Sequence, residues 1–543
     1  MFYFLWLGPH AGVGGPWDIT RILERDPGAM GKPDSPLWGP LHAPHHWGES
    51  IFGYYTSDDP YVLRKHAQML SDAGVDAVAF DVTNQLTYRD QYTALLRTWQ
   101  AVRDEGGRTP QVVFLCPFGQ PGKVVRELWR DLYEPGRHRD LWFQWGGKPL
   151  ILADVERLGE EAGESGEVVA RRRDFFTWRA PQQDYFQGPT RPDMWGWLEV
   201  HPQHVFRDSK GTAEQMAVGV AQNAVNGRLG SMSESAGARG RSFHAGARDT
   251  RPGAVARGLN FAEQWEHALR ADPRALFVTG WNEWIAGRHA EFNGVREPVM
   301  FVDQFDHEHS RDIEPMKGGH GDAYYYQFAA AVRRYKGTPA VPAAATGKSI
   351  DIAGPFSQWD DVAPGFADDA GDVAHRDHPG YAGHTRYINR SGRNDIVLVK
   401  STSAGGVRHF LAVTRRPLTP ASDPAWMWLL VDADGDVSTG WEGFDLMVNR
   451  LPPSNGLAPV ERCVGGWKWE SVGQVPIRFE GCFLHLSIPE SLMGGGGVRG
   501  HIDFKWADAM PENGDIVSWL DGGDTAPNGR FVYRIQTALK TAP

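Results

Sequence analysis

The sequence predicts an α/β plus all-β protein, a (β/α)8 TIM-type barrel followed by an antiparallel β-sandwich. Short apolar runs alternate with helical patterns up to the run that ends at Trp281, which is typical of a parallel barrel. Beyond residue 348, strand-like runs follow one another between Gly, Asp and Pro turns, with hardly a helical pattern. The segment between these regions is rich in Pro, Ala and Gly. We therefore expect a barrel over residues 1–335, a linker over 336–348 and a β-sandwich over 349–543.

Eight apolar runs with the length of buried strands favour a closed barrel over an open sheet. The clearest helix between them covers residues 57–74. Ser57 to Asp59 offer N-caps, Pro60 suits the first turn, and Gly74 ends the helix. The expected barrel strands are residues 2–7, 75–82, 111–118, 149–155, 174–178, 194–200, 228–232 and 275–281. The expected sandwich strands include residues 350–354, 395–400, 409–413, 426–432, 482–488 and 531–535.

Charge and composition exclude several kinds of partner. A net charge of −11 leaves no basic surface for nucleic acid, and no apolar run approaches the roughly 20 residues that cross a bilayer. The 3 cysteines lack the spacing of a disulfide framework or a zinc site. The chain holds 22 tryptophans, whose flat apolar faces suit sugar rings as well as cores. We expect a carbohydrate partner, no nucleic acid and no membrane span, and the oligomeric state stays open.

The opening residues MFYFLWLG are too short for a signal peptide and lack its basic start, so we interpret them as the first strand. A leader removed ahead of them would place the protein in the periplasm or outside the cell. Without such a leader the protein is cytoplasmic, and the sequence leaves both compartments open.

Functional side chains of a parallel barrel lie at the C-terminal ends of its strands, and several predicted strands end in acids. A single acid at such a position is more often a helix cap or part of a salt bridge. A ring of them is costly to bury, which favours a functional role. These acids are Asp81, with Asn84 close behind it, Asp154, Glu199, with His201 and His204 behind it, Glu234 and Glu283.

Paired carboxylates flanked by tryptophan are what cleavage of a glycosidic bond requires. One acid protonates the departing oxygen, and the other acts as base or nucleophile. Glu283 and Glu199 are the expected catalytic pair, with Glu314 as the next candidate. Tryptophans near such a pair stack on sugar and raise the pKa of a carboxyl by desolvation. The neighbours expected to contact substrate are Trp197, Trp281, Asn282 and Trp284.

Two further segments are candidates for substrate contact. The long connection after the first strand, residues 8–59, contains His45, His46 and Trp47, which we expect to bind sugar rather than metal. The segment 234–258 is rich in Gly and Arg, including Arg241. It is either a surface loop or a lid whose arginines meet acidic sugars.

Two motifs identify a family resemblance for the first domain. TGWNEWIAG (279–287) followed by IEP (313–315), and the helix-to-strand run 58–84, resemble the glycoside hydrolase family 99 and WbsX-like group. The resemblance implies a (β/α)8 barrel that cleaves α-mannoside linkages or processes bacterial surface polysaccharides. In family 99 enzymes two glutamates three residues apart are catalytic, one deprotonating the substrate 2-hydroxyl and one acting as general acid. Glu283 matches the first glutamate, but Ala286 occupies the second position.

The second domain resembles a family 9 carbohydrate-binding module or the related DOMON-type sandwich. The resemblance rests on IDIAGPFSQWDDV (350–362) and on the run 426–450 with its TGW motif. Within that run Asp432, Asp434 and Asp436 alternate on a tight turn, a spacing that can hold a structural Ca²⁺ through oxygen ligands. No other cofactor is expected to be required.

These observations predict a glycoside hydrolase that uses paired carboxylates at the C-terminal face of the barrel. The departure at Ala286 keeps two alternatives open. One is a non-catalytic glycan-binding protein on a barrel of the same type. The other is a polysaccharide lyase or a factor in surface-polysaccharide processing.

Overall fold

The computed structural model describes residues 1–159, 164–235, 237–342, 347–494 and 500–536, so residues 343–346 of the predicted linker lie outside it. The chain forms two compact units. Unit 1 consists of Met1–Ala101, Thr109–Gly337 and His378–Tyr387, and unit 2 of Val102–Arg108, Thr338–Asp377 and Ile388–Pro543. Residues 378–387 thus belong to the first unit, although they follow the predicted linker.

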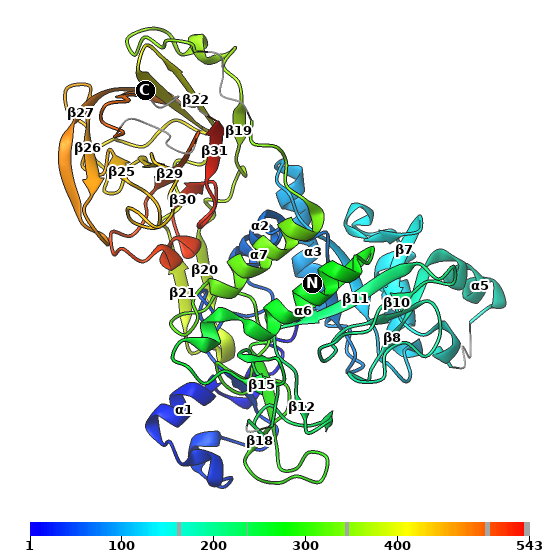
Figure 1. Ribbon diagram of the computed structural model, residues 1–543. Coiled ribbons are helices and arrows are strands. Elements are labelled where there is room, and N and C mark those ends of the chain that lie inside the picture. The colour runs from blue at the N-terminus through cyan, green and yellow to red at the C-terminus, as the bar shows by residue number, and fades with distance from the viewer. Residues whose placement is uncertain (160–163, 236, 343–346, 495–499, 537–543) are drawn as a thin grey trace. The chain divides into compact units, whose positions relative to one another are not determined.

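Parallel strands form the centre of unit 1 (Figure 1). One sheet has the order β1-β4-β5-β7-β8-β9 with all neighbours parallel, and a second pairs β11 in parallel with β16. Both sheets contribute to one apolar cluster, which includes Phe2, Leu115, Leu152 and Phe277. The strands are β1 (Phe2–Tyr3), β4 (Ala77–Asp81), β5 (Gln111–Leu115), β7 (Lys148–Leu152), β8 (Thr177–Gln182), β9 (Met194–Gly196), β11 (Ala213–Gly219) and β16 (Ala275–Thr279), with β6 (Gln144–Trp145) beside β7 and β10 (Phe206–Arg207) beside β11.

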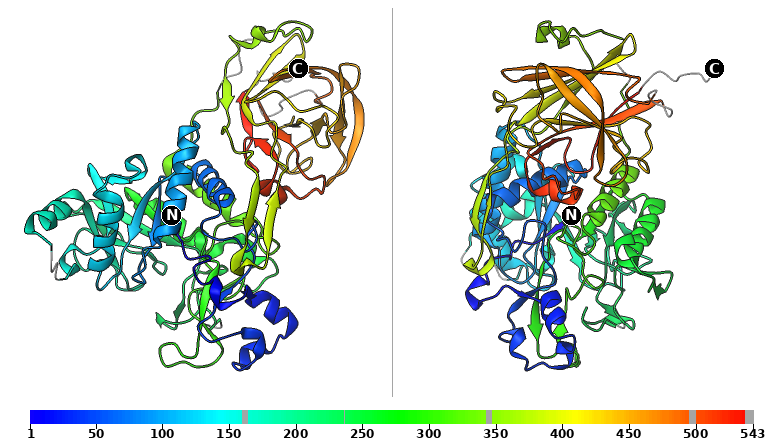
Figure 2. Two further views of the ribbon diagram at one scale, coloured as in Figure 1. Left: turned by 180° about the vertical axis from the view of Figure 1, so that it is seen from behind. Right: turned by 90° about the vertical axis from the view of Figure 1, so that its left-hand side faces the viewer.

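Helices connect many of these strands. In the predicted helix, Asp59 accepts the Tyr61 N–H, Pro60 opens the first turn, and Gly74 follows the end with φ of +84°, so this prediction is confirmed. Helices α6 and α7 lie side by side (Figure 2), with the rings of Trp265 and Phe328 6.3 Å apart. The helices are α1 (Ile19–Arg25), α2 (Pro60–Asp72), α3 (Arg89–Asp104), α4 (Gly122–Leu128), α5 (Gly166–Phe175), α6 (Leu259–Ala271) and α7 (Ala323–Lys336).

The predicted barrel strand at 228–232 is wrong. Its first residues form the exposed β13 (Arg228–Leu229), which pairs in a hairpin with the buried β12 (Ala224–Val225). The strand beside β16 is β11, which escaped notice because the buried Glu214 and Gln215 interrupt its apolar pattern. Arg179 and two tryptophan indoles bond the carboxylate of Glu214, which is how a charged side chain is accommodated there.

The long connection 8–59 folds against the segment that follows β16. Together they form a small sheet in the order β18-β17-β3-β2. Its strands are β2 (Trp17–Asp18), β3 (Pro44–His46), β17 (Ile285–His289) and β18 (Met300–Phe301). Two pairs of short strands form separate two-stranded sheets, β14 (Phe243–His244) with β15 (Ala247–Arg248) and β20 (Arg376–Pro379) with β21 (Arg386–Asn389). The predicted substrate loop is therefore an ordered part of the fold.

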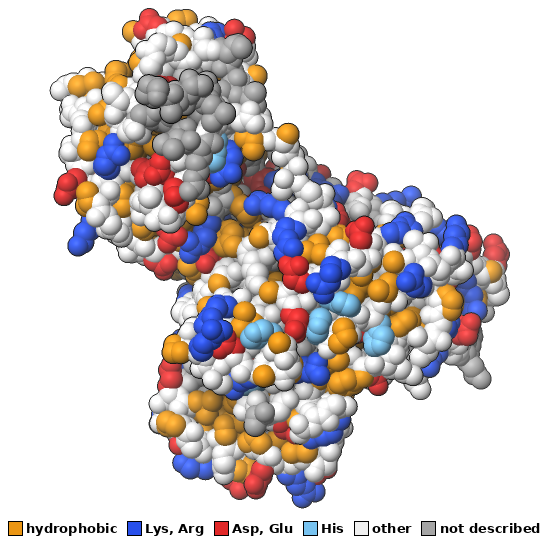
Figure 3. Space-filling view, in the orientation of Figure 1, with side chains coloured by type: hydrophobic (Ala, Val, Ile, Leu, Met, Phe, Trp, Pro, Cys, Tyr) orange, Lys and Arg blue, Asp and Glu red, His pale blue; other side chains and the backbone are white. Residues whose placement is uncertain are grey.

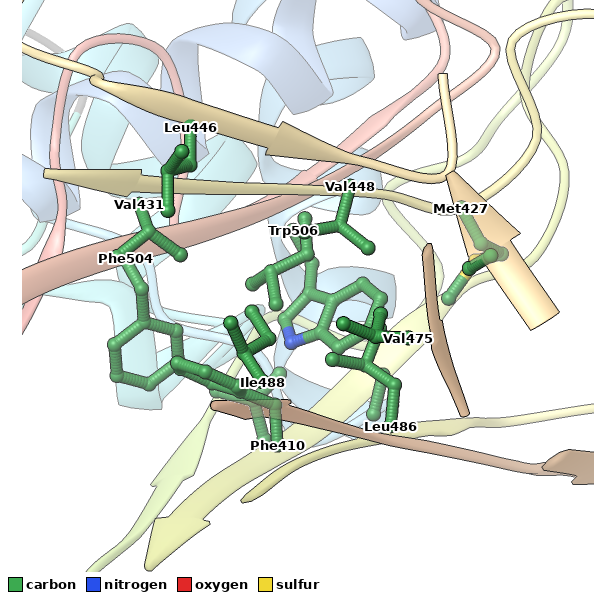
Figure 4. Close-up of a cluster of buried hydrophobic side chains, with 14 of the residues drawn as sticks. Phe410, Met427, Val431, Leu446, Val448, Val475, Leu486, Ile488, Phe504 and Trp506 are labelled. Carbon is green, nitrogen blue, oxygen red and sulfur yellow. The ribbon is translucent and has the colours of Figure 1, made fainter. Parts of the chain in front are cut away.

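Unit 2 is built on one large antiparallel sheet that surrounds an apolar core. The strand order is β19-β22-β23-β28-β27-β26-β25-β24-β29-β30, with β31 beside β29. Phe410, Val448, Leu486 and Trp506 come from four of these strands and meet in the same core (Figure 4). The strands are β19 (Gly365–Ala367), β22 (Ile396–Ala404), β23 (Val407–Thr414), β24 (Trp428–Asp432), β25 (Leu446–Val448), β26 (Leu457–Cys463), β27 (Trp469–Glu480), β28 (Phe483–Pro489), β29 (His501–Asp508), β30 (Asp524–Ala526) and β31 (Tyr533–Gln536).

One sandwich strand predicted from sequence is wrong, because residues 350–354 form turns. The other predicted runs fall on β22, β23, β24, β28 and β31. Strands such as β27 were missed because many of their side chains are exposed and polar.

Positive and negative side chains are interspersed over the face of the molecule shown in Figure 3. Among the described residues, no helix has the length and apolar character needed to cross a membrane.

Candidate active site

A cavity of about 240 Å³ lies at the C-terminal ends of the parallel strands of unit 1. Its polar residues lie at or after the ends of β4, β16 and β18, and its aromatic residues lie in or after β1, β5 and β9. The polar lining residues are Asp81, Thr83, Asn84, Glu283, Asp303 and Arg311, and the aromatic ones are Phe2, Phe4, Trp6, Phe118 and Trp197. This is the position at which a parallel barrel carries its chemistry.

Glu283 is 3% exposed, and the side-chain donors around it contact only one of its two carboxyl oxygens. Its Oε2 accepts Gln304 Nε2 at 2.7 Å and the Arg311 guanidinium at 2.9 and 3.1 Å. Its backbone N–H donates to the buried Asp312 carboxylate. Since all three side-chain donors reach Oε2, the orientation of the carboxyl group is fixed and Oε1 is the oxygen left for a proton.

Arg311 joins two of the cavity acids. Besides Glu283, its Nη2 lies 3.2 Å from Asp303 Oδ1. The Arg311 side chain is 1% exposed, whereas that of Asp303 is 41% exposed. Asp303 is therefore the carboxylate that water reaches, and Glu283 is the one shielded from it.

The cavity is lined by three carboxyl groups and one guanidinium, so acidic groups outnumber basic ones. Burial raises the pKa of Glu283 well above its usual range, and Asp303, Asp312 and Asp81 add to this, while Arg311 opposes it. Burial also raises the pKa of Asp81, although hydrogen bonds from Thr83 act in the opposite direction. We expect the proton that such a cluster retains at neutral pH to be on Glu283, the more buried acid.

Aromatic rings form the opposite wall. Phe4 and Trp6 stack with centroids 5.1 Å apart, and Tyr185 meets Trp197 edge to face at 5.5 Å. The Arg311 guanidinium lies 5.9 Å from the Trp197 ring centroid. A sugar ring in the cavity would thus meet carboxyl groups on one side and flat apolar faces on the other.

A second cavity, of about 660 Å³, shares Phe118 with the first. Its lining includes Tyr185, Arg157, Arg191 and Arg228. All three arginines are ion-paired, Arg157 and Arg191 with Asp154 and Arg228 with Glu234. The shared aromatic ring makes the two cavities neighbours.

Four residues predicted from sequence line the first cavity: Asp81, Asn84, Trp197 and Glu283. They come from three different strands. Of the five acids expected to converge, Asp81 and Glu283 line this cavity, whereas Asp154, Glu199 and Glu234 do not.

Glu199 is not among the residues that line either cavity. It is fully buried, and its two oxygens accept the His204 backbone N–H at 2.8 Å and bond His204 Nδ1 at 2.9 Å. Burial raises the pKa of Glu199 to about 7. The structure thus does not bring Glu199 to the cavity of Glu283, and its catalytic role has no support from this geometry.

Glu314 is also fully buried, inside a network of donors. Its Oε1 accepts Ser50 Oγ at 2.6 Å and lies 3.2 Å from His66 Nε2, and its Oε2 accepts Tyr55 Oη at 2.8 Å and Trp284 Nε1 at 2.6 Å. A carboxylate enclosed in this way connects segments of the fold, which argues against the expected contact with substrate.

The cluster around His45 is also part of the packing. The two ring nitrogens of His45 bond the carbonyls of Ala43 and Trp38, and burial lowers its pKa to about 4. His46 is buried against two tyrosines, with a pKa lowered to about 3 by burial. Trp47 stacks on Trp284 at 4.9 Å and donates to Asp312 at 2.5 Å. The expectation that these residues contact sugar is corrected by their burial.

The motif that includes Glu283 is mostly structural. Trp281 is fully buried, and Trp284 is held between Trp47 and Glu314. Asn282 exchanges hydrogen bonds with the Phe4 backbone at 2.9 and 3.2 Å, which ties the end of β16 to the residues after β1. Of the four residues in this motif, only Glu283 lines the cavity.

The remaining predicted contacts lie outside the first cavity. His201 is half-buried and lies 4.0 Å from Glu263. Glu234 pairs with Arg228 at 2.7 Å at the rim of the second cavity. Arg241 of the predicted lid is fully buried, 4.2 Å from the Tyr324 ring centroid, so it supports the fold.

The acidic turn of unit 2 differs in one member from the predicted set. Asp432 and Asp434 bring carboxylate oxygens within 4.8 Å of Asp445, and Asp445 takes the place expected for Asp436. Asp436 instead accepts the Ser438 N–H and hydroxyl. Calcium at this turn stays a prediction.

Arg311, Asp303 and Trp6 were missed in the sequence. Asp303 follows the short apolar run VMFV, and Trp6 belongs to the first predicted strand, so both had weak signals. Arg311 had none, because nothing local indicates that its side chain reaches two acids from other segments.

No protein-family profile and no curated protein match the chain. The solved structures that resemble it include two of the GH99 endo-alpha-mannosidase from Bacteroides thetaiotaomicron, one of them in complex with Bis-Tris-propane. Sequence identity is 15% in each case, with TM-scores of 0.36 and 0.37. Each alignment covers 62% of this chain and 96% of the other.

Proposed function

We propose that the protein is a glycoside hydrolase whose catalytic acids are Glu283 and Asp303. The observation that carries the proposal is the cavity itself. One buried carboxyl group and one water-accessible carboxylate are joined by Arg311 and face aromatic rings. Cleavage of a glycosidic bond needs two acids in different protonation states at one sugar-sized site.

The two acids divide the reaction between them. Glu283 donates the proton on Oε1 to the glycosidic oxygen while the bond from that oxygen to the anomeric carbon breaks. Asp303 then either removes a proton from the attacking water or attacks the anomeric carbon itself. Arg311 holds both carboxyls, and Asp81 and Asn84 are placed to bond sugar hydroxyls.

This assignment differs from the role that the family resemblance implies for Glu283, because burial favours its protonated form. Ala286 lies in β17, is 3% exposed and faces His45 of β3. The motif position of the second family acid is therefore remote from the lining of the cavity, and Asp303 supplies the second carboxylate from the loop after β18.

The proposal includes a closed (β/α)8 barrel made from the two parallel sheets of unit 1. Gly196 of β9 exchanges two hydrogen bonds of 2.8 Å with the Gln215 side chain of β11. On the other side, the Trp281 N–H after β16 donates to the Phe2 carbonyl of β1 at 2.8 Å. These contacts support closure at both junctions.

Unit 2 is proposed to be a carbohydrate-binding sandwich. Support comes from a tryptophan cluster in which Trp467 and Trp469 are half-buried beside Trp441, with the Trp441 and Trp467 ring centroids 4.4 Å apart. A non-catalytic glycan-binding protein is the second candidate function, because the second glutamate of the family motif is replaced by Ala286.

The test is a screen of the purified chain against neutral and acidic polysaccharides, with products identified by mass and NMR. On a cleaved substrate, we expect Glu283→Gln and Asp303→Asn each to lower kcat about 10²-fold or more, because each removes an acid or base. Glu199→Gln is the matched control and retains activity.

The anomeric configuration of the first product shows whether Asp303 acts as base or as nucleophile. Full activity in the Glu283→Gln variant would contradict the proposed mechanism. Binding of glycans without released reducing ends would establish the second candidate function instead.

A further inference from the structure

A second group of acids lies in unit 2, away from the predicted calcium turn. Asp368 and Asp372 are on the loop after β19, and Asp524 begins β30. One carboxylate oxygen from each of the three lies within 4.8 Å of the others. Asp524 is far from the other two in sequence, so the fold brings it to them.

Asp524 has an unsatisfied atom that points to a ligand. Its side chain belongs to a residue that is 3% exposed, and Oδ2 accepts the Ile396 N–H at 2.6 Å. Oδ1 is also buried and has no hydrogen-bond partner among the described residues. A buried carboxylate oxygen without a donor is costly, and such atoms in native proteins call for an ion or water.

The loop that supplies the other two acids is fixed in place. The Gly371 N–H donates to both oxygens of Asp395 at 3.1 and 2.9 Å, and Asp368 accepts the Tyr533 hydroxyl at 3.1 Å. Asp372 is 6% exposed. The carboxylates are therefore held close together by the backbone and by neighbouring strands.

Three carboxylates at this spacing repel one another strongly in a poorly solvated place. Burial raises the pKa of Asp524 well above its usual range, and the charges of Asp372 and Asp368 raise it further. A bound cation would relieve this repulsion. It would also coordinate the buried Oδ1 of Asp524, which has no hydrogen-bond partner among the described residues.

We propose that Asp368, Asp372 and Asp524 bind one divalent cation, of which Ca²⁺ fits best. Ca²⁺ prefers carboxylate and carbonyl oxygens and tolerates irregular geometry, whereas Mg²⁺ demands near-ideal octahedral coordination. The ion would link the loop after β19 to the start of β30 and, through the Ile396 bond, to the start of β22. Its role would be to stabilise unit 2, and it is independent of the proposed hydrolase activity.

The predicted turn at Asp432 and Asp434 offers a matched control. Its carboxylates already accept backbone N–H groups, from Gly435 to Asp432, from Asp436 to Asp434, and from Ala433 to Asp445. No buried carboxylate oxygen of that turn lacks a partner among the described residues. The two acidic groups thus differ in the one feature on which the proposal depends.

The experiment uses the full chain, stripped of metal with a chelator and then titrated with CaCl₂ by calorimetry and thermal melting. We expect wild type and Asp434→Asn to bind Ca²⁺. At about 100 times Kd, the unfolding temperature of unit 2 should rise by about 5–10 °C in both. Asp524→Asn and Asp372→Asn should each lose the binding and the rise.

Asp524→Asn is expected to fold, because the Asn side-chain oxygen can still accept the Ile396 N–H. Without metal it should melt at or above the wild-type temperature, since one repelling charge is gone. The proposal is overturned if wild type binds no Ca²⁺, if Asp434→Asn abolishes binding, or if both Asp524→Asn and Asp372→Asn retain it.

Discussion

Glu283 and Glu314 both lie just beyond β16, because the Glu314 N–H donates to the Trp281 carbonyl, yet their carboxyl groups have different surroundings. Both are buried, and the Asp312 segment lies between them. Glu314 has donors on both oxygens and lines neither cavity. Glu283 has its donors on one oxygen only and lines the cavity.

Burial alone does not distinguish an acid that supports the fold from one proposed to react with substrate. The distinguishing feature is whether hydrogen-bond donors reach both carboxyl oxygens or only one. A carboxylate that accepts hydrogen bonds on both oxygens and lines no cavity is held within the fold and offers no accessible oxygen to a substrate. A carboxyl bonded on one oxygen, with other acids nearby, is held in position and keeps its second oxygen available. Each of the following changes alters one side of this comparison.

The largest expected effect comes from removing the guanidinium that joins the cavity acids. Arg311→Met should lower kcat/KM about 10²-fold or more, because both carboxyls lose the group that orients them. It should also raise the pKa of Glu283 further, since Arg311 opposes the effect of burial. Activity that needs protonated Glu283 is lost as pH rises through that pKa, so the alkaline limb should move to higher pH.

A pH–rate profile of kcat/KM checks this expectation, with Arg311→Lys as the control that keeps a positive charge. An alkaline limb that stays in place or moves to lower pH in Arg311→Met would contradict the assignment of Glu283 as the acid.

The next effect concerns stability. Glu314→Gln should lower the free energy of unfolding by about 3 kcal/mol, because the amide group cannot accept all the donors that surround Glu314. Denaturant unfolding measures the loss, and kcat of the folded enzyme should stay within a few-fold of wild type.

Glu283→Gln is the matched variant for this experiment and should show the opposite pattern, with stability nearly unchanged and turnover lost. If Glu314→Gln proved stable but inactive, the distinction between the two acids would fail.

The sequence predicted those features that depend on local pattern. The α2 helix, with Asp59, Pro60 and Gly74 at its ends, was found because caps and breakers act within a few residues. Asp81, Asn84 and Glu283, which line the cavity, could be selected from the sequence because each lies at or shortly after the end of an apolar run.

Features that depend on distant partners were not predictable. Glu314 takes its donors from Ser50, Tyr55 and Trp284, and two of these lie more than 200 residues away. Nothing near Glu314 in the sequence distinguishes it from Glu283. The same limit hid β11, whose Glu214 is tolerable only beside Arg179 and two tryptophans.

Two tryptophans differ in the same way, one being part of the packing and the other lining the cavity. Trp281 is sealed in the core, whereas Trp197 lines the cavity and is only partly buried. Trp197→Phe should raise KM about threefold and leave kcat nearly unchanged, because phenylalanine keeps a ring for stacking but offers less area. Steady-state kinetics on the cleaved glycan measures this, with Trp281→Phe as the variant that should lower the unfolding temperature without changing KM. Equal KM values in wild type and Trp197→Phe would mean that the sugar does not stack on this wall, and the aromatic side of the site would then have to be sought at Trp6 and Phe118.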